Sequence, residues 1–133
     1  MTSSLLVVDC SAIVELLLDP GDRGAAVAAH LHDRALAAPS LLPFEVTNVL
    51  RRQRQAGLLT PAHADRAYAD WCDLPVDLWA FATVADRLWR LAGSLSAYDA
   101  AYVALAELLQ APLLTCDRKL AGAAPQTCAV VVL

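Results

Sequence analysis

Four acidic residues, Asp9, Glu45, Asp99 and Asp117, stand where this sequence could build a site for chemistry. Each is expected near the end of a helix or strand, where ligand sites of α/β proteins collect. If the four carboxylates converged, they would repel one another and their pKa values would rise unless a cation lay among them. A set of oxygen ligands suits Mg²⁺ or Mn²⁺ better than zinc or copper. Convergence of these acids would therefore predict a divalent metal site.

Asp9 and Asp117 each follow a short apolar run that is expected to be a buried strand, Leu5–Val8 for the first and Leu113–Thr115 for the second. The carboxyl ends of parallel strands meet at one edge of a sheet, and loops at that edge carry the ligand sites. We therefore expect both acids at the same edge.

Asp99 and Glu45 are expected near the starts of helices. Ser96 is a suitable N-cap with Asp99 three residues later, so a helix is predicted to begin near Ala97. Glu45 lies beside the apolar stripe of a predicted helix, from which it could project toward the same edge. Taken singly, each of the four acids also has a structural explanation as a helix cap, a turn residue or a partner of a helix dipole. Spacing alone leaves both interpretations open.

Alternating strand and helix patterns predict the fold that must position these acids. Strands separated by helical segments imply crossover connections and a mainly parallel sheet with helices on both faces. The predicted strands are Leu5–Val8, Leu36–Ala38, Val76–Trp79, Leu113–Thr115 and Ala129–Leu133. The predicted helices cover residues 11–18, 22–34, 42–54 and 61–74, a segment between a Thr83 cap and Gly93, a segment from Ala97 toward Pro112, and a short helix or turn at 121–124. The expected fold is thus an α/β three-layer domain, residues 1–133, with about five short strands.

Composition limits the classes of function. The chain has 133 residues, enough for one domain with a buried core. Hydrophobic residues make up 58% and mean hydropathy is +0.47, so a homo-oligomer or another partner is expected to cover apolar surface. The formal net charge of −4 gives no general attraction to nucleic acid. Apolar runs too short for a bilayer and cysteines without a Cys-x-x-Cys pair favour a cytoplasmic protein with reduced thiols and no membrane association.

Four stretches of the sequence resemble PIN-domain ribonucleases, and more closely the VapC toxins of toxin–antitoxin pairs. These stretches are Val7–Ala12, Pro43–Arg52, Ser96–Tyr102 and Leu113–Asp117. The resemblance covers nearly the whole chain and implies a PIN-like fold, cleavage of RNA with Mg²⁺ or Mn²⁺, a homodimer and a cognate antitoxin protein as partner. It implies that the metal-binding and catalytic residues are Asp9, Glu45, Asp99 and Asp117, supported by Ser11, Asn48 and Thr115.

Local positive charge would be needed to hold RNA on an acidic protein. Four basic residues border the proposed metal site along the sequence and are the candidate phosphate contacts: Arg51, Arg52, Arg118 and Lys119. None of the three histidines is placed like a general base, which agrees with a mechanism in which a metal ion activates water.

Other classes of protein stay open at this stage. A non-catalytic interaction module could keep the same fold, and it should show no Mg²⁺ or Mn²⁺ site on titration. A receiver domain also has an acid after its first strand, but Asp9 is followed by Cys10 rather than by a second acid. A phosphatase with an Asp nucleophile would benefit from an acid two residues later, where this chain has Ser11.

Overall fold

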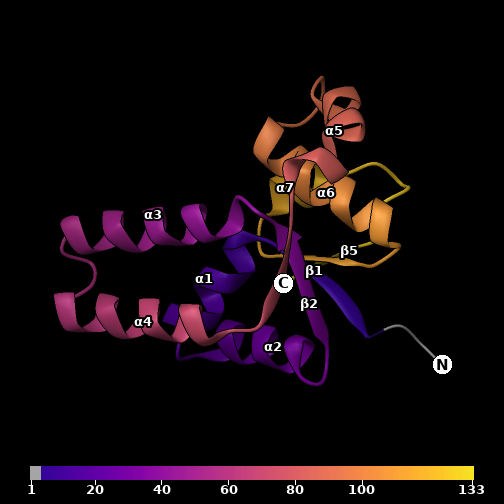
Figure 1. Cartoon of the computed structure of the whole chain (residues 1–133). Helices are drawn as coiled ribbons and strands as arrows, with labels where there is room; N and C mark the ends of the chain where they lie inside the picture. Colours follow the sequence, from indigo (N-terminus) through magenta and orange to yellow (C-terminus); the bar gives the residue numbers. More distant parts are fainter. Residues whose placement is uncertain (1–3) are drawn as a thin grey trace.

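A five-stranded parallel sheet with helices on both faces forms the centre of the computed structural model, which describes residues 4–133 (Figure 1). Residues 1–3 of the predicted domain lie outside this range. The strands are β1 Leu5–Val8, β2 Ala35–Pro39, β3 Val76–Trp79, β4 Leu113–Thr115 and β5 Val130–Val132. Every neighbouring pair is parallel. The predicted α/β class and the sheet of about five strands are confirmed.

The order of the strands, β3-β2-β1-β4-β5, puts β1 in the middle. The chain winds outward from β1 through β2 to β3 on one side, and through β4 to β5 on the other. The switch point of the sheet therefore lies between β1 and β4, and ligand sites of open α/β sheets form beside such a point. Val8 of β1 is in register with Leu114 of β4, so the residues that follow these two strands emerge together.

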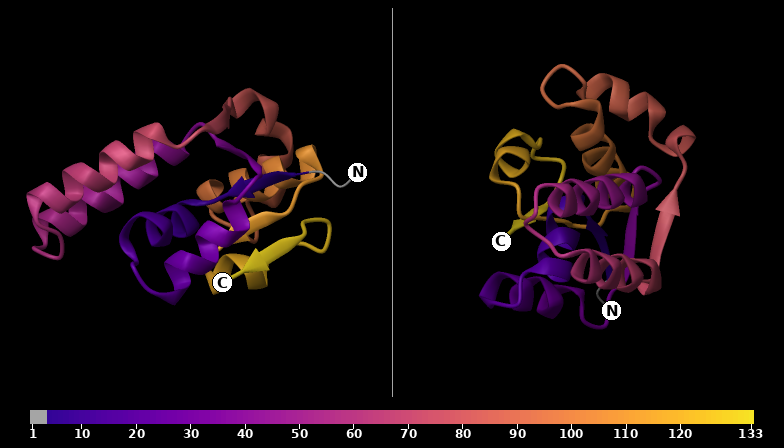
Figure 2. Two further views of the ribbon diagram at one scale, coloured as in Figure 1. Left: turned by 90° about the horizontal axis from the view of Figure 1, so that it is seen from below. Right: turned by 90° about the vertical axis from the view of Figure 1, so that its left-hand side faces the viewer.

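Eight helical segments connect the strands within residues 4–133. They are α1 Cys10–Leu18, α2 Asp22–Leu31, α3 Leu42–Gln55, α4 Pro61–Asp73, the 3-10 turn η1 Phe81–Thr83, α5 Ala85–Leu91, α6 Ala97–Leu109 and α7 Arg118–Ala123. Helix α6 packs over β1, β2 and β4, with α5 beside it, while α1 and α2 lie on the other side of the sheet (Figure 1). The antiparallel pair α3 and α4 projects beyond the sheet as a long hairpin (Figure 2).

The core is centred on β1, β4 and α6. Leu6, Val7 and Val8 are completely buried, and residues 100–106 of α6 are all buried. Small alanine side chains let this helix approach the sheet closely. A close approach also occurs at Gly24, where a Cβ atom would lie 2.0 Å from the Asp19 carbonyl oxygen. No helix within residues 4–133 has the length and apolar character needed to cross a membrane.

The predicted N-cap at Thr83 is wrong. Thr83 ends the 3-10 turn, where its hydroxyl donates to the carbonyl of Ala80 at 2.6 Å. Helix α5 instead begins at Ala85, and its cap residue Val84 provides no side-chain hydrogen bond. Thr83 lies inside the 3-10 turn, one residue before the cap position of α5, and its hydroxyl bonds back to that turn.

Two helix boundaries also differ from the prediction. The helix predicted to reach residue 34 ends at Leu31, because His32 adopts an extended backbone conformation with ψ of 129° and Asp33 then adopts a left-handed one with φ of 57°. The short helix predicted at 121–124 begins earlier, at Arg118, because the Asp117 side chain caps it.

Candidate active site

The four acids predicted from the sequence line one cavity of about 370 Å³ at the carboxyl edge of the sheet. Asp9 directly follows β1 and Asp117 lies two residues after β4, so these two acids flank the switch point. Glu45 and Asp99 occupy the first turns of α3 and α6. Elements from distant parts of the chain thus bring the four carboxylates to one place, which we call the acidic cavity.

Asp9 is the most firmly held of the four acids. It is 5% exposed and caps α1, with its Oδ1 accepting from the backbone N–H of Ala12 at 3.0 Å. The same oxygen accepts from the Ser11 hydroxyl at 2.7 Å, and Oδ2 accepts from the Thr115 hydroxyl. Burial raises the pKa of Asp9, and these hydrogen bonds oppose the rise. The carboxylate is therefore oriented by three donors before any ligand binds.

Ser11 and Thr115 also tie the ends of β1 and β4 together. The Ser11 hydroxyl accepts from the Cys116 backbone N–H at 2.9 Å, and the Thr115 hydroxyl accepts from the Asp117 backbone N–H at 2.9 Å. Since each hydroxyl gives its single hydrogen to Asp9, each can accept from the β4 side. Two of the three residues predicted as polar supports, Ser11 and Thr115, therefore hold both Asp9 and the loop that carries Asp117.

Glu45 is held by a residue that the sequence analysis missed. The hydroxyl of Tyr102 on α6 donates to Glu45 Oε1 at 2.5 Å, and Tyr102 is only 2% exposed. Burial, and then the bond to Glu45, raise the pKa of Tyr102, so it remains a protonated donor. Tyr102 lies three residues after Asp99, and this spacing puts both on one face of α6. That spacing was the available sign that Tyr102 faces the site.

Neighbouring carboxylates add to the raised pKa of Asp9, Glu45 and Asp99. Burial is the largest cause for Glu45 and Asp99; Asp9 and then Asp99 add to the pKa of Glu45, and Asp117 adds to that of Asp99. No ion pair within residues 4–133 involves any of the four acids. These four carboxylates therefore concentrate negative charge without an ion-pair partner, whereas Glu15, which also lines the cavity, pairs with Arg23 at 3.8 Å.

The donor set of the acidic cavity fits a hard divalent cation. Its carboxylates offer oxygen ligands, as Mg²⁺ and Mn²⁺ prefer. Cys10 also lines the cavity, but burial, Glu45 and Asp9 raise its pKa to about 12, so it stays a thiol rather than a soft thiolate ligand. As the side chains stand, no three His, Cys, Asp or Glu residues in the described part of the chain are arranged to hold a metal ion. Binding would thus require acid side chains to draw inward around the ion.

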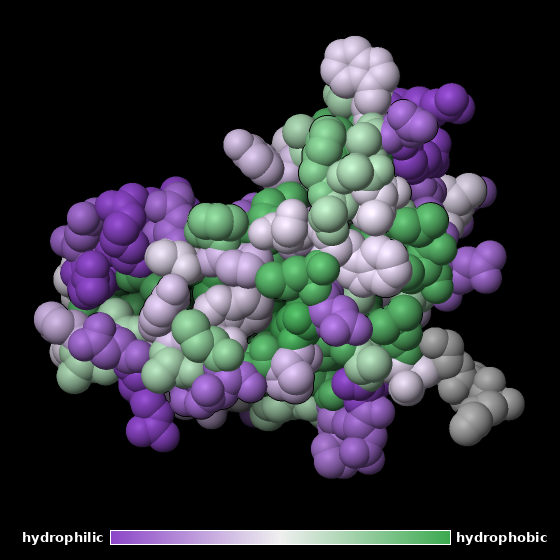
Figure 3. Space-filling view, in the orientation of Figure 1, coloured by the Kyte–Doolittle hydropathy of each residue, from purple (hydrophilic) through white to green (hydrophobic). Residues whose placement is uncertain are grey.

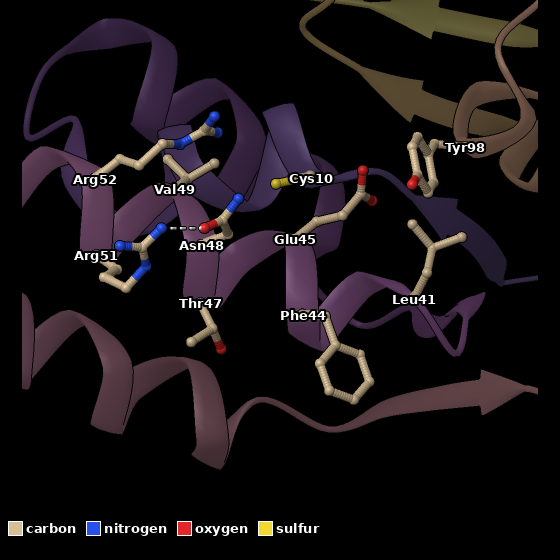
Figure 4. A pocket seen from close by; sticks show the side chains of 10 residues that line it. All are labelled: Cys10, Leu41, Phe44, Glu45, Thr47, Asn48, Val49, Arg51, Arg52 and Tyr98. Atoms are coloured by element: carbon tan, nitrogen blue, oxygen red, sulfur yellow. Dashed lines mark hydrogen bonds between the residues drawn. The ribbon is translucent and has the colours of Figure 1, made fainter.

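A second pocket, of about 550 Å³, adjoins the acidic cavity (Figure 4). The two share Cys10, Glu45 and Val49 as lining residues. The predicted support Asn48 lines this second pocket and not the acidic cavity, and its side chain accepts from Arg51 at 2.9 Å. We call it the side pocket.

The predicted basic residues fall into two groups. Arg51 and Arg52 line the side pocket. Arg118 and Lys119 form the exposed first turn of α7, immediately after Asp117, and line neither the acidic cavity nor the side pocket. The structure therefore sets positive charge on two flanks of the acids.

Comparison with known proteins gives consistent matches. The family described as PIN domain matches residues 6–124. The chain is 36% identical to Ribonuclease VapC9 of Mycobacterium tuberculosis over 129 residues, covering 97% of this chain and 98% of that protein. It is 38% identical to Ribonuclease VapC3 of the same organism over 125 residues, covering 94% and 91%. Among solved structures, VapBC2 from Rickettsia felis bound to a DNA fragment matches with a TM-score of 0.69 and 11% identity, covering 96% of this chain and 98% of that chain.

Proposed function

The chain belongs to the PIN-domain family, and from this we infer that it is a metal-dependent endoribonuclease, the toxin of a VapC-type toxin–antitoxin pair. The curated relatives it matches are named ribonucleases, and the matches run over nearly the full length of both partners. The observation that carries the proposal is the convergence in one cavity of Asp9, Glu45, Asp99 and Asp117, none of which forms an ion pair within residues 4–133.

We propose Mg²⁺ or Mn²⁺ as the ion and the four carboxylates as its ligands. A divalent ion bound there would supply a more acidic water and stabilise charge on a phosphodiester oxygen. The protein's part is to hold the ligands. Ser11 and Thr115 fix Asp9, and Tyr102 fixes Glu45, so little reorganisation of these two acids is needed.

The basic residues on the two flanks are proposed to hold the phosphates of the RNA. Arg51 and Arg52 would contact the RNA strand on the side-pocket flank. Arg118 and Lys119 would contact it on the α7 flank. Such contacts would position the strand while the acids select the phosphodiester to be cut.

Exposed apolar residues support a homodimer and an antitoxin partner. Trp89 is 81% exposed and Phe81 is 66% exposed. Apolar surface gathers over the sheet and beside α5 and α6, whereas the end of the α3–α4 hairpin is largely hydrophilic (Figure 3). Apolar surface of this kind on a cytoplasmic toxin is where a partner chain would bind.

Cleavage of a structured RNA by the purified protein tests the function. We expect cleavage with Mg²⁺ or Mn²⁺, none with EDTA, and loss of cleavage in Asp117→Asn. Asp86→Asn is the matched control, because Asp86 is an exposed acid on α5 outside the cavity. Cleavage that continues in EDTA, or in Asp117→Asn at the level of the control, would reject the mechanism. A protein that binds no Mn²⁺ would instead be a non-catalytic module.

A further inference from the structure

The side pocket combines features that suit an unpaired nucleotide. Its volume of about 550 Å³ is in the range of small-ligand sites. It shares Glu45 and Cys10 with the acidic cavity. An RNA strand with one phosphate at the four acids would therefore have a neighbouring nucleotide beside this pocket. Any such role rests on the proposed ribonuclease function.

Two exposed aromatic residues border the side pocket, and each directly precedes an acid of the cavity. Tyr98 comes before Asp99 and is 65% exposed, and Phe44 comes before Glu45 and is 78% exposed. Both rings therefore emerge from the same helix turns that deliver the acids. Exposed rings beside a nucleic-acid channel serve as stacking platforms for bases.

Arg52 gives the side pocket a free positive charge. Its guanidinium makes no hydrogen bond or ion pair with other residues in the part of the chain that the structure describes. Its neighbour Arg51 is held by Asn48 and Gln55. Figure 4 shows Arg52 and Tyr98 on opposite sides of the Glu45 side chain. An unpaired guanidinium in a chain of net charge −4 favours an anionic ligand.

An adjoining pocket is better suited to a protein partner. Tyr98 and Leu41 also line a pocket of about 270 Å³ together with Phe81, Val84 and Leu88, which has no charged lining residue. An apolar peptide would bury its side chains there at less cost than beside Arg52 and Glu45. The charge of the side pocket thus distinguishes it from the apolar surface next to it.

We propose that the side pocket binds one unpaired nucleotide of the RNA next to the cleaved phosphodiester. Tyr98 stacks on the base, and Arg52 contacts the adjacent phosphate. The enzyme would therefore require a single-stranded nucleotide at this position, and a fully paired duplex would be a poor ligand.

Binding of a short single-stranded oligoribonucleotide labelled with 2-aminopurine tests the proposal. The experiment is done in EDTA, which prevents cleavage. We expect Tyr98→Ala to weaken binding by roughly 5- to 100-fold and to reduce quenching of the label, as loss of one stacked base would. Tyr98→Phe keeps the aromatic ring, so it should retain both the RNA affinity and the quenching of the label. Arg52→Ala should lower the slope of log K against log salt by about 0.7, the value for one phosphate contact on a single strand.

Tyr68→Ala and Arg90→Ala are the matched controls, since both residues are exposed and lie outside the side pocket. Thermal melting verifies that every variant is folded. If Tyr98→Ala and Arg52→Ala change RNA binding no more than these controls do, the proposal is overturned. It is also overturned if the two variants keep RNA binding but lose binding to a co-expressed antitoxin. If wild type binds RNA through Tyr98 and Arg52 but does not cleave it with Mg²⁺ or Mn²⁺, the ribonuclease function fails and the nucleotide site stands.

Discussion

The two ends of helix α6 place carboxylates in opposite electrostatic settings. Near the C-terminal end, Glu107 accepts from Arg87 at 2.7 and 3.1 Å and from the Thr127 hydroxyl, and these partners lower its pKa. Near the N-terminal end, burial and then the charge of Asp117 raise the pKa of Asp99. Glu107 has its own cation, whereas none of the four predicted acids of the cavity forms an ion pair in the described part of the chain. This difference distinguishes a structural carboxylate from one that is proposed to bind an external cation.

Among the variants that test this difference, Asp99→Asn should have the largest effect on RNA cleavage. Asparagine keeps the backbone N–H that donates to Ser96 and removes only the charge. We expect kcat for RNA cleavage to fall by about 10²- to 10⁴-fold, since a metal ligand supports several kcal/mol of transition-state stabilisation. The affinity for Mn²⁺, measured by titration calorimetry, should fall as well. Cleavage and Mn²⁺ affinity equal to those of wild type would remove Asp99 from the proposed site.

Tyr102→Phe should have the next largest effect, because it removes only the hydroxyl that holds Glu45. We expect kcat to fall by about 10- to 100-fold, as for loss of a group that orients a metal ligand. KM for RNA should change little, since Tyr102 is buried. Tyr68→Phe, at an exposed tyrosine, is the control.

A double-mutant cycle decides whether Tyr102 acts through Glu45. In Glu45→Ala the hydroxyl has no carboxylate to orient, so adding Tyr102→Phe should reduce kcat no further. If the two reductions multiply, Tyr102 affects catalysis by another route, and its role as a positioning residue is wrong.

The strand-end acids could be predicted from the sequence, because their positions depend on local order. A buried apolar run followed by an acid predicts both the strand and the place of the carboxylate, as it does for Asp9 and Asp117. The contact between Tyr102 and Glu45 could not be predicted in this way. It joins residues 57 positions apart and depends on how α3 and α6 cross. The Thr83 cap was wrong because a 3-10 turn includes Thr83 and places Val84 at the cap position of α5.

The raised pKa values predict how the metal-free protein responds to pH. The pKa values of Asp9, Glu45 and Asp99 lie above their ordinary values. As pH rises, the unfolded chain therefore loses these protons at a lower pH than the folded protein does. Stability from these groups is therefore present below the ordinary carboxyl values of 3.8 and 4.5 and declines as pH rises toward the folded-state values. Glu107 behaves in the opposite way, because its lowered pKa stabilises the fold above the ordinary value.

The melting temperature measured in EDTA tests whether the ionised cavity acids destabilise the fold. Glu45→Gln keeps an acceptor for Tyr102 and removes one charge, so it should melt at a higher temperature than wild type at pH 7.5, with a smaller difference at pH 4. Mn²⁺ at ten times its Kd should stabilise wild type by about 1.4 kcal/mol. A lower melting temperature for Glu45→Gln at pH 7.5 would show that the cavity acids are not under mutual repulsion.

Glu107→Gln should have the smallest effect and complete the comparison. It removes the charge that Arg87 pairs with, and because Arg87 is partly exposed we expect the melting temperature to fall by only about 2–4 °C. RNA cleavage and Mn²⁺ affinity should equal those of wild type, since Glu107 lines no part of the acidic cavity. If Glu107→Gln instead lost cleavage while keeping its melting temperature, a cation-paired acid would be acting in the reaction. The lack of a cation partner would then no longer distinguish the acids that bind metal from those that hold the fold.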